Sequence, residues 1–228
     1  MNFKSLCSAA LATVGVCALV FGGTSAAKAD TYNYGNINNG MWYQFWDNSD
    51  GPSFNQNGQG NYSVWWGNYG GDFTCGTGWS TGSWQNIGYD VGSFSMNGFG
   101  MVGVYGWTLG KNYGYPDTEY YVVEMSAGSG PGGTYYGSFY TDNAWYNVYH
   151  NFNPSGTGLH KDNPNGQEQW ISVRQGNSNV NQLNVVTIAN HFNEWQSLGW
   201  RMGDFDYQIL GTEGGFGGSG YVNGTAWH

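Results

Sequence analysis

Residues 118–125 read Thr118-Glu119-Tyr120-Tyr121-Val122-Val123-Glu124-Met125. A run so rich in β-branched and aromatic residues is typical of a β-strand. Because side chains alternate along a strand, Glu119 and Tyr121 share one face, and Glu124 lies on the other. The segment therefore predicts a strand that sets a carboxylate beside a tyrosine.

A second segment near the C-terminus has the same property. Residues 206–215 read Asp206-Tyr207-Gln208-Ile209-Leu210-Gly211-Thr212-Glu213-Gly214-Gly215, and alternation places Tyr207 and Glu213 on one face. Two carboxylates on one sheet face are what glycoside cleavage requires, an acid for the leaving oxygen and a carboxylate for the anomeric carbon. The alternative is that either Glu is an ordinary solvated strand residue.

The remaining chain predicts an all-β sandwich or barrel with one helix. Short runs of Tyr, Trp, Val, Ile and Thr alternate with clusters of Gly, Asn, Ser and Asp. Only Ala189–Leu198, which Gly199 follows, has near-helical spacing of its apolar residues. The predicted strands are Met41–Trp46, Tyr62–Trp66, Ser93–Met96, Met101–Trp107, Glu119–Met125, Thr134–Tyr140, Trp145–His150, Glu168–Arg174, Val185–Ile188 and Tyr207–Thr212.

The composition excludes several classes of function. With 6 Lys+Arg against 15 Asp+Glu, the formal charge is −9, so the chain lacks the basic patch that binding to nucleic acid needs. Aromatic residues make up 18% of the sequence and 40 residues are Gly. Aromatic rings stack on the apolar faces of sugars, so this composition suits a carbohydrate cleft, although the rings could instead simply fill the core.

Residues 1–29 have the pattern of a secretion signal. A positive charge at Lys4 precedes the apolar run Leu11–Phe21, and Ala27-Lys28-Ala29 has the small-residue form of a cleavage site. The run is shorter than the roughly 20 residues that a membrane-spanning helix needs. We therefore expect a secreted protein with no membrane contact after cleavage, in which residues 30–228 form a single catalytic domain.

The sequence predicts neither a metal nor another cofactor. Four His residues show no spacing typical of a zinc site. The oxygen-rich stretch Asp47-Asn48-Ser49-Asp50-Gly51 could bind calcium, but these are also the usual residues of a turn, which is the interpretation we favour.

Five segments, in this order along the chain, resemble the family 11 glycoside hydrolases, which are endo-1,4-β-xylanases. They are Val104-Tyr105-Gly106-Trp107, Glu119-Tyr120-Tyr121-Val122-Val123-Glu124, Ser172-Val173-Arg174, Ala189-Asn190-His191-Phe192-Asn193-Glu194-Trp195, and Thr212-Glu213-Gly214 at the end of a strand. The resemblance runs from about Tyr32 to about Tyr221.

The resemblance implies a β-jelly roll of two antiparallel sheets with a single α-helix and a cleft for β-1,4-linked xylose chains. It implies hydrolysis of xylan with retention of anomeric configuration by double displacement, without a cofactor. Glu119 matches the nucleophile, ionised in the free enzyme, and Glu213 matches the protonated general acid/base. We expect a monomer whose partner is its polysaccharide substrate.

The supporting residues carry over one at a time. Trp46 resembles a stacking platform for a xylose, and Tyr105 and Tyr121 resemble tyrosines that contact the reacting sugar and the nucleophile. Gln169 and Tyr207 match two further hydrogen-bonding positions. Asp72 falls where the family has Asn or Asp beside the acid/base, and members with Asp there work best at acid pH, so we expect an acidic optimum.

The chain also departs from the family pattern. The stretch between Trp107 and Glu119 is several residues longer than usual, and Met101 stands where Tyr is common. The thumb loop, which usually carries Pro-Ser-Ile after an Arg, is rewritten at Asn151–Gly158. Two alternatives stay open, a non-catalytic carbohydrate-binding protein and a β-1,4-glucanase on the same scaffold.

Overall fold

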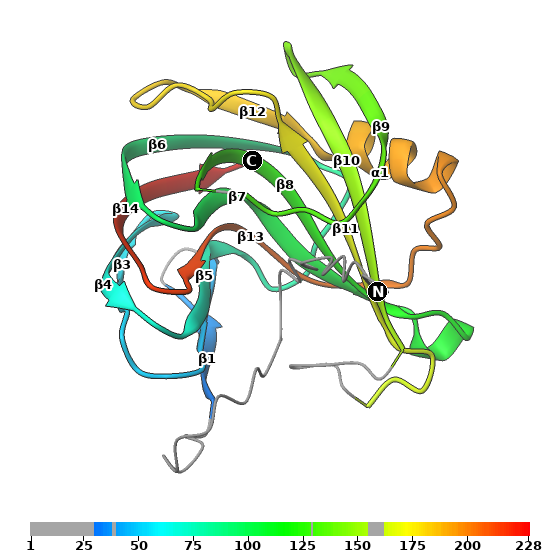
Figure 1. Cartoon of the computed structure of the whole chain (residues 1–228), viewed down its shortest axis with the longest axis horizontal. Coiled ribbons are helices and arrows are strands. Elements are labelled where there is room, and N and C mark those ends of the chain that lie inside the picture. Colours follow the sequence, from blue (N-terminus) through cyan, green and yellow to red (C-terminus); the bar gives the residue numbers. More distant parts are fainter. Residues whose placement is uncertain (1–29, 38–39, 129, 155–161) are drawn as a thin grey trace, which may run out of the picture.

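The computed structural model describes residues 30–228, except for 38–39, 129 and 155–161. The expected secretion signal, residues 1–29, lies outside the described residues, and so do residues 155–158 of the rewritten thumb loop. The described chain folds into two β-sheets, one α-helix and a short 3-10 helix, η1 (Lys111–Tyr113) (Figure 1). None of the helices in this part of the chain is long and apolar enough to cross a membrane.

The larger sheet, sheet A, has nine strands and the smaller, sheet B, has five. In spatial order, sheet A consists of β1 (Thr31–Asn36), β2 (Trp42–Asp47), β5 (Asp72–Trp79), β13 (Asp204–Gly215), β7 (Gly100–Leu109), β8 (Asp117–Ala127), β11 (Gln167–Arg174), β10 (Ala144–Asn153) and β9 (Thr134–Thr141). Sheet B consists of β12 (Asn184–Thr187), β6 (Asn86–Asn97), β14 (Gly218–Trp227), β4 (Asn61–Tyr69) and β3 (Ser53–Gly58).

The predicted fold class is confirmed: all ten predicted strands are present, and the helix α1 (Ile188–Ser197) starts one residue earlier than expected. Four strands were not predicted, namely β1, β3, β5 and β14. The sheets are antiparallel throughout their described pairs except between β8 and β11, which run parallel. This exception arises because the β9–β10 hairpin sits at the sheet edge, so the chain returns through β11 in the direction of β8.

One face of sheet A is buried against the rest of the protein, and we call it the rear face. Sheet B covers part of it, where Trp66 of β4 meets Phe73 of β5 with ring centroids 5.0 Å apart. Helix α1 covers another part, where Phe192 packs edge-on against Tyr120 of β8. The opposite side of sheet A, which carries Glu119 and Glu213, is the front face. The main hydrophobic core therefore lies behind the sheet, and the acids lie in front of it.

Helix α1 is held by one apolar stripe. Its buried residues are Ile188, His191, Phe192 and Trp195, a spacing that places them on one side of a helix. Trp195 also donates a hydrogen bond from Nε1 to Ser172 Oγ of β11 at 3.0 Å. The helix thus supports the strands β8 and β11, whose front-face residues surround Glu119.

A row of three glycines crosses the front face between the two acids. Gly76, Gly211 and Gly103 are direct cross-strand partners on β5, β13 and β7. A Cβ atom on Gly103 would lie 2.0 Å from the carbonyl oxygen of Val122, and one on Gly76 would lie equally close to that of Leu210. Such contacts are impossible for any other residue, so glycine permits the strands to approach this closely.

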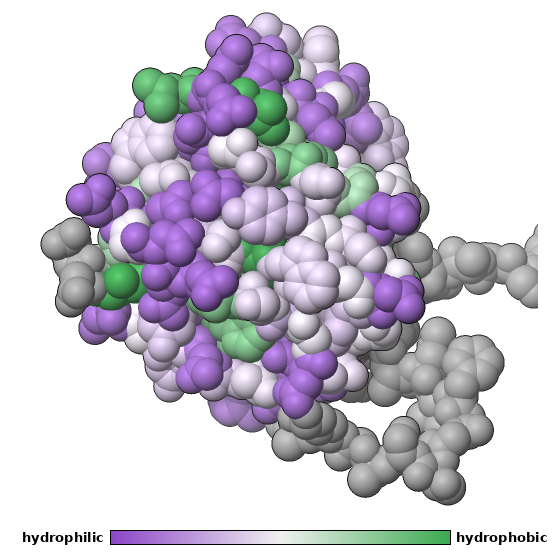
Figure 2. Space-filling view, turned by 90° about the vertical axis from the view of Figure 1, so that its left-hand side faces the viewer, coloured by the Kyte–Doolittle hydropathy of each residue, from purple (hydrophilic) through white to green (hydrophobic). Residues whose placement is uncertain are grey.

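The outer face of sheet B contrasts with the front face of sheet A. Its five strands carry a single acidic or basic side chain, Asp90. Figure 2 views the side of the molecule on which β3, β4 and β14 lie and shows mainly hydrophilic and pale side chains there. Trp65 of β4 and Tyr221 of β14 are cross-strand partners on this face, 55% and 40% exposed.

The glycine row predicts a graded response to alanine. We expect Gly103→Ala to lower the free energy of unfolding by about 1–3 kcal/mol or more, because the added methyl meets rigid backbone. Gly211→Ala is the matched control in the same row, since its Cβ would meet the Tyr105 side chain at 3.2 Å. Urea unfolding of both variants measures the difference, and equal stabilities would contradict the steric argument.

Candidate active site

The register of sheet A brings the predicted residues of β7, β8 and β11 together. Glu119 of β8 pairs with Trp107 of β7 and Gln169 of β11. Tyr121, two residues further on, pairs with Tyr105 of β7. The alternation predicted from the sequence is present: Glu119 and Tyr121 lie on the front face. Glu213 comes from β13, which β7 separates from β8.

Glu119 is surrounded by hydrogen-bond donors. Its Oε1 accepts from the hydroxyls of Tyr105 and Tyr121, both at 2.9 Å. Its Oε2 accepts from Gln169 Nε2 at 2.7 Å and from Gln167 Nε2 at 3.4 Å. Burial raises the pKa of Glu119, and these four bonds act in the opposite direction because they stabilise the charged form. The carboxylate is held in one orientation, with its oxygens aimed by fixed partners.

Tyr121 links the two acids. Its hydroxyl lies 2.9 Å from Glu119 Oε1 and 2.7 Å from Glu213 Oε2. The two carboxyl oxygens therefore cannot be further apart than the sum of these distances, about 5.6 Å. A phenol has one proton, so it donates fully to only one of them. The arrangement is satisfied when Glu213 is protonated and donates to Tyr121, which donates to Glu119.

The surroundings of Glu213 disfavour a negative charge more strongly than those of Glu119. It is 3% exposed, and burial raises its pKa well above the usual range, with the nearby charges of Asp72 and Glu119 adding to the shift. Its only described hydrogen-bond partner is Tyr121, and its Oε1 is buried with no partner among the described residues. Burial and nearby charges thus raise the pKa of Glu213 more strongly than that of Glu119.

Asp72 lies at the start of β5, on the same face as Glu213. Asp72 pairs with Gly215 and Thr74 pairs with Glu213, so the two carboxyls are diagonal neighbours across adjacent strands. Burial, and then the charge of Glu119, raise the pKa of Asp72 to about 8. Asp72 Oδ1 is buried and has no hydrogen-bond partner among the described residues. Asp72 and Glu213 therefore form a desolvated pair whose protonation states depend on each other.

The structure places Tyr207 and Trp46 further from the acids. Tyr207 is buried on the front face with its ring edge-on to Tyr105, 5.8 Å between centroids. Trp46 of β2 pairs with Thr74 of β5, which in turn pairs with Glu213. Trp46 therefore shares the face and the cross-strand row of Glu213, two strands away, and is partly exposed.

Three supporting residues were missed by the sequence analysis. Trp107 donates from Nε1 to the Tyr105 hydroxyl at 2.8 Å, which leaves the Tyr105 proton for Glu119. Gln167 is the weaker second donor to Glu119 Oε2. Asn151 donates to Gln169 Oε1 at 3.1 Å and orients that amide. No local motif identifies them, because their role depends on the register of β7, β10 and β11.

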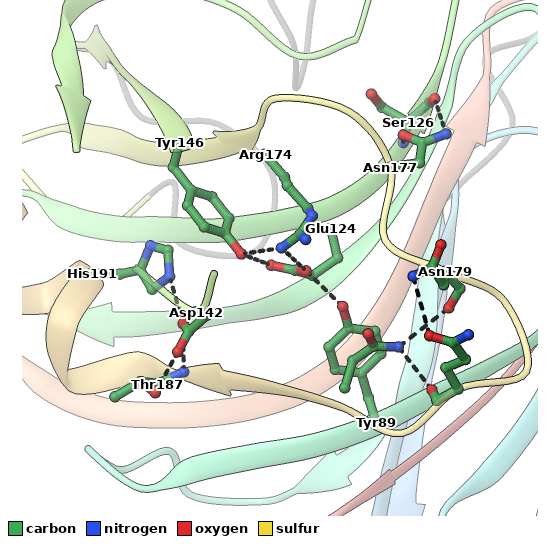
Figure 3. A network of polar contacts seen from close by, with 12 residues as sticks. Tyr89, Glu124, Ser126, Asp142, Tyr146, Arg174, Asn177, Asn179, Thr187 and His191 are labelled. Carbon is green, nitrogen blue, oxygen red and sulfur yellow. Dashed lines mark hydrogen bonds and ion pairs between the residues drawn. The ribbon is translucent and has the colours of Figure 1, made fainter. Parts of the chain in front are cut away.

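Glu124 shows why the face of a carboxylate matters (Figure 3). It points to the rear of β8, where it accepts hydrogen bonds from Tyr146 at 2.5 Å and Tyr89 at 2.6 Å, with Arg174 3.6 Å away. Burial raises the pKa of Glu124, and these partners counteract the shift. Among the residues that the structure describes, its hydrogen-bond and ion-pair partners are two tyrosines and Arg174 rather than a second carboxyl group, so it belongs to the packing behind the sheet.

Metal binding has no support among the described residues, where no group of three or more His, Cys, Asp or Glu side chains could hold an ion. The oxygen-rich stretch after β2 is a turn: Asp47 Oδ1 accepts hydrogen bonds from the backbone N–H groups of Ser49 and Asp50, at 3.0 and 2.7 Å. This side chain is used within its own loop.

Comparison with known proteins agrees with the fold. A family model described as glycosyl hydrolases family 11 matches residues 38–225. A two-sheet glycoside hydrolase is the class that these observations define. The chain belongs to glycosyl hydrolase family 11.

Individual relatives cover most of the chain. It is 38% identical over 220 residues to endo-1,4-beta-xylanase 2 of Rhizopus oryzae and 36% identical over 222 residues to an ethylene-inducing xylanase of Penicillium digitatum, covering 94% of this chain and of each relative. It is 37% identical to endo-1,4-beta-xylanase B of Penicillium oxalicum, spanning 59% of that protein's length. A solved structure from a comparison of two Trichoderma reesei endo-1,4-beta-xylanases matches 80% of this chain and 95% of its own, with a TM-score of 0.68 at 33% identity.

The hydrogen bonds to Glu119 predict an effect on its ionisation. Replacing Gln169 by Met removes the 2.7 Å donor to Oε2. Because this bond stabilises the carboxylate, its loss raises the pKa of Glu119. Carbon-13 NMR titration of the glutamate carboxyls measures the shift. Gln175→Met, at an exposed glutamine just past the end of the same strand, is the control and should leave the pKa of Glu119 unchanged.

Proposed function

We propose that the protein is a retaining endo-1,4-β-xylanase that hydrolyses internal β-1,4 bonds of xylan by double displacement. The observation that carries the proposal is the Tyr121 bridge, which limits the separation of the Glu119 and Glu213 oxygens to about 5.6 Å. Retaining glycosidases have carboxyl groups roughly 5–5.5 Å apart, whereas inverting enzymes leave roughly 6.5–9.5 Å for a water molecule. The relatives described above are named as endo-1,4-beta-xylanases, which supports xylan as the substrate.

In the first step, the Glu119 carboxylate attacks the anomeric carbon of a xylose while Glu213 gives its proton to the departing glycosidic oxygen. The products are a covalent glycosyl ester on Glu119 and the released end of the chain. Esterification removes the charge of Glu119, one of the causes that raise the pKa of Glu213. The pKa of Glu213 then falls, as a general base requires.

In the second step, Glu213 takes a proton from water, and the resulting hydroxyl attacks the anomeric carbon from the side opposite Glu119. The ester bond breaks, the Glu119 carboxylate is restored and the sugar leaves with its original configuration. Throughout the cycle, Tyr105, Gln167 and Gln169 keep Glu119 aimed at one point.

We propose that Asp72 shifts the pH optimum toward acid from the value that Glu213 alone would give. Asp72 and Glu213 lose their protons in two steps, the first at lower pH, because the charge left by the first step opposes the second. We propose that the active state is the more protonated one, with Glu119 ionised. Activity then falls as the pH rises through the first of these steps.

We further propose that residues 1–29 direct secretion and are removed, that residues 30–228 form a single catalytic domain, and that the mature protein acts as an extracellular monomer. The charge pattern of residues 1–29 supports secretion. An extracellular location suits a polymeric substrate that cannot enter a cell.

The proposal predicts that each acid is indispensable. We expect Glu119→Gln and Glu213→Gln to lower kcat on soluble xylan by at least about a hundred- to ten-thousandfold, since each removes a covalent or proton-transfer role. Glu194→Gln, on the outward side of α1, is the matched control and should retain activity. Reducing-sugar release measures kcat, and proton NMR of the first product reads its anomeric configuration.

Three outcomes would contradict parts of the proposal. An inverted first product would exclude Glu119 as nucleophile. Faster hydrolysis of carboxymethylcellulose than of xylan would favour the β-1,4-glucanase. Binding of xylan without any release of reducing sugar would favour the non-catalytic carbohydrate-binding protein.

Asp72→Asn should move the pH optimum upward, because the alkaline limit of activity would then be set by Glu213 alone.

The Asp72→Asn substitution should also change how the stability of the protein depends on pH. The pKa of Asp72 is about 8 in the folded protein against 3.8 ordinarily, so the wild type loses stability as pH rises between these values. The variant should gain stability over the wild type from pH 4 to pH 8. Activity profiles and thermal unfolding at several pH values test both, and an unmoved optimum would remove Asp72 from the acid/base unit.

A further inference from the structure

Two large aromatic side chains lie exposed near the tip of the β9–β10 hairpin. Tyr140 of β9 and Trp145 of β10 are cross-strand partners with ring centroids 5.6 Å apart and planes at 65°. They are 58% and 51% exposed. Leaving two rings of this size exposed side by side forgoes the free energy of burying them. Exposed apolar patches of this kind often mark a binding site.

The pair lies on the front face of sheet A. Tyr146 and Val148 of β10 are fully buried in the rear core, so the alternate residues Trp145, Asn147 and Asn151 point to the front. Asn151 orients Gln169, which in turn holds Glu119. Trp145 is therefore on the same surface as the proposed active site, about 20 Å along β10 from Asn151 by strand geometry.

The surface between these points is polar, aromatic and free of acidic groups. Asn147 Oδ1 accepts from Ser138 at 2.7 Å and from Gln175 at 2.8 Å, so its amide is held in place. Tyr135 of β9 and Tyr149 of β10 are cross-strand partners, with 5.7 Å between their ring centroids. The only titratable group on β9 or β10 besides the tyrosines is His150, which points to the rear toward Glu168. Such a surface matches a neutral sugar chain with apolar ring faces and hydroxyls.

The hairpin does not need the ring pair to keep its shape. Asp142 and Asn143 form its turn with positive φ values of 47° and 58°, the conformation of a tight two-residue hairpin. Asp142 also accepts hydrogen bonds from the Thr187 N–H at 2.9 Å and the Thr187 hydroxyl at 2.6 Å, which tie the turn to the start of α1 (Figure 3). Behind the hairpin, His191 packs edge-on against Phe139 and Tyr146.

We propose that Tyr140 and Trp145 form a distal sugar-stacking platform that binds the same xylan chain whose bond is cleaved between Glu119 and Glu213. This inference rests on the proposed function. The platform extends the binding surface beyond the reacting sugars, so it acts only on chains long enough to reach it. It raises affinity for long chains without taking part in bond cleavage.

The test compares substrates of different length. We expect Trp145→Ala and Tyr140→Ala each to raise KM for soluble xylan about three- to tenfold, the loss expected for one stacking contact. The kcat on xylan, and all constants for xylotriose, should remain those of the wild type. Trp145→Phe keeps a ring and should restore most of the affinity. Thermal unfolding of each variant verifies that the hairpin is folded.

Trp65→Ala is the matched control, because Trp65 is similarly exposed but lies on the outer face of sheet B. An equal rise in KM for Trp65→Ala, or an equal loss on xylotriose and on xylan, would overturn the platform. To separate this inference from the proposed function, binding of xylohexaose and xylotriose is measured by calorimetry with Glu119→Gln present in every variant. If the wild type cleaves no xylan, the proposed function fails, and weaker xylohexaose binding on loss of Trp145 still supports the platform. Unchanged xylohexaose binding would overturn it even in an active enzyme.

Discussion

Two buried carboxyl groups, Glu119 and Glu213, share the hydroxyl of Tyr121, and the front face of sheet A is organised around this contact. The single proton of Tyr121 satisfies both groups only when one of them is protonated. Burial and nearby charges raise the pKa of Glu213 more strongly than that of Glu119. The asymmetry comes from the neighbours: Glu119 receives donors from three further side chains, whereas Glu213 faces the charge of Asp72. In the mechanism we propose, two identical side chains act as nucleophile and acid because their surroundings shift their pKa values unequally.

The fold provides this arrangement because the two faces of sheet A have different roles: the rear face packs against the apolar core, and the front face carries the acids. Sheet B and α1 cover the rear of sheet A with a continuous apolar core, which leaves the front free to bury polar groups at close range. Burying charge there is unfavourable, and the rear packing compensates for it. Gly76 lets β5 approach β13, and Gly103 lets β7 approach β8, the strands that carry Glu213, Tyr105 and Tyr121 on the front face. The close approach of the strands and the positions of the acids therefore depend on each other.

The local sequence pattern predicted the strands that are rich in β-branched and aromatic residues. It missed strands that consist largely of glycine, asparagine and serine. The strands β3 and β14 are rich in Gly, Asn and Ser, and β5 is interrupted by Gly76 and Gly78, so all three look like loops in the sequence. The face of Glu119 could be predicted from alternation, because it depends only on its own strand. The contacts that Gln167 and Trp107 make around Glu119 could not be predicted. These two residues come from strands whose neighbours are set by the order of the whole sheet. The parallel pairing of β8 with β11 has the same origin. Thus properties of one strand were accessible from sequence, and properties of strand order were not.

Glu119 and Glu124 show how little of a residue's role lies in the residue itself. Both are buried glutamates on β8, both accept hydrogen bonds from two tyrosines, and burial raises the pKa of both. Glu124 lies near Arg174 at 3.6 Å, so its charge is neutralised within the rear packing. No Lys, Arg or His among the described residues forms an ion pair with Glu119; its described donors are neutral amides and phenols, which hold a negative charge without cancelling it. A carboxylate that stays charged, oriented and unneutralised is the form that can attack an electron-poor carbon. In the mechanism we propose, the groups that face each carboxylate, rather than its burial or its position in the strand, therefore separate the structural Glu124 from the nucleophile Glu119.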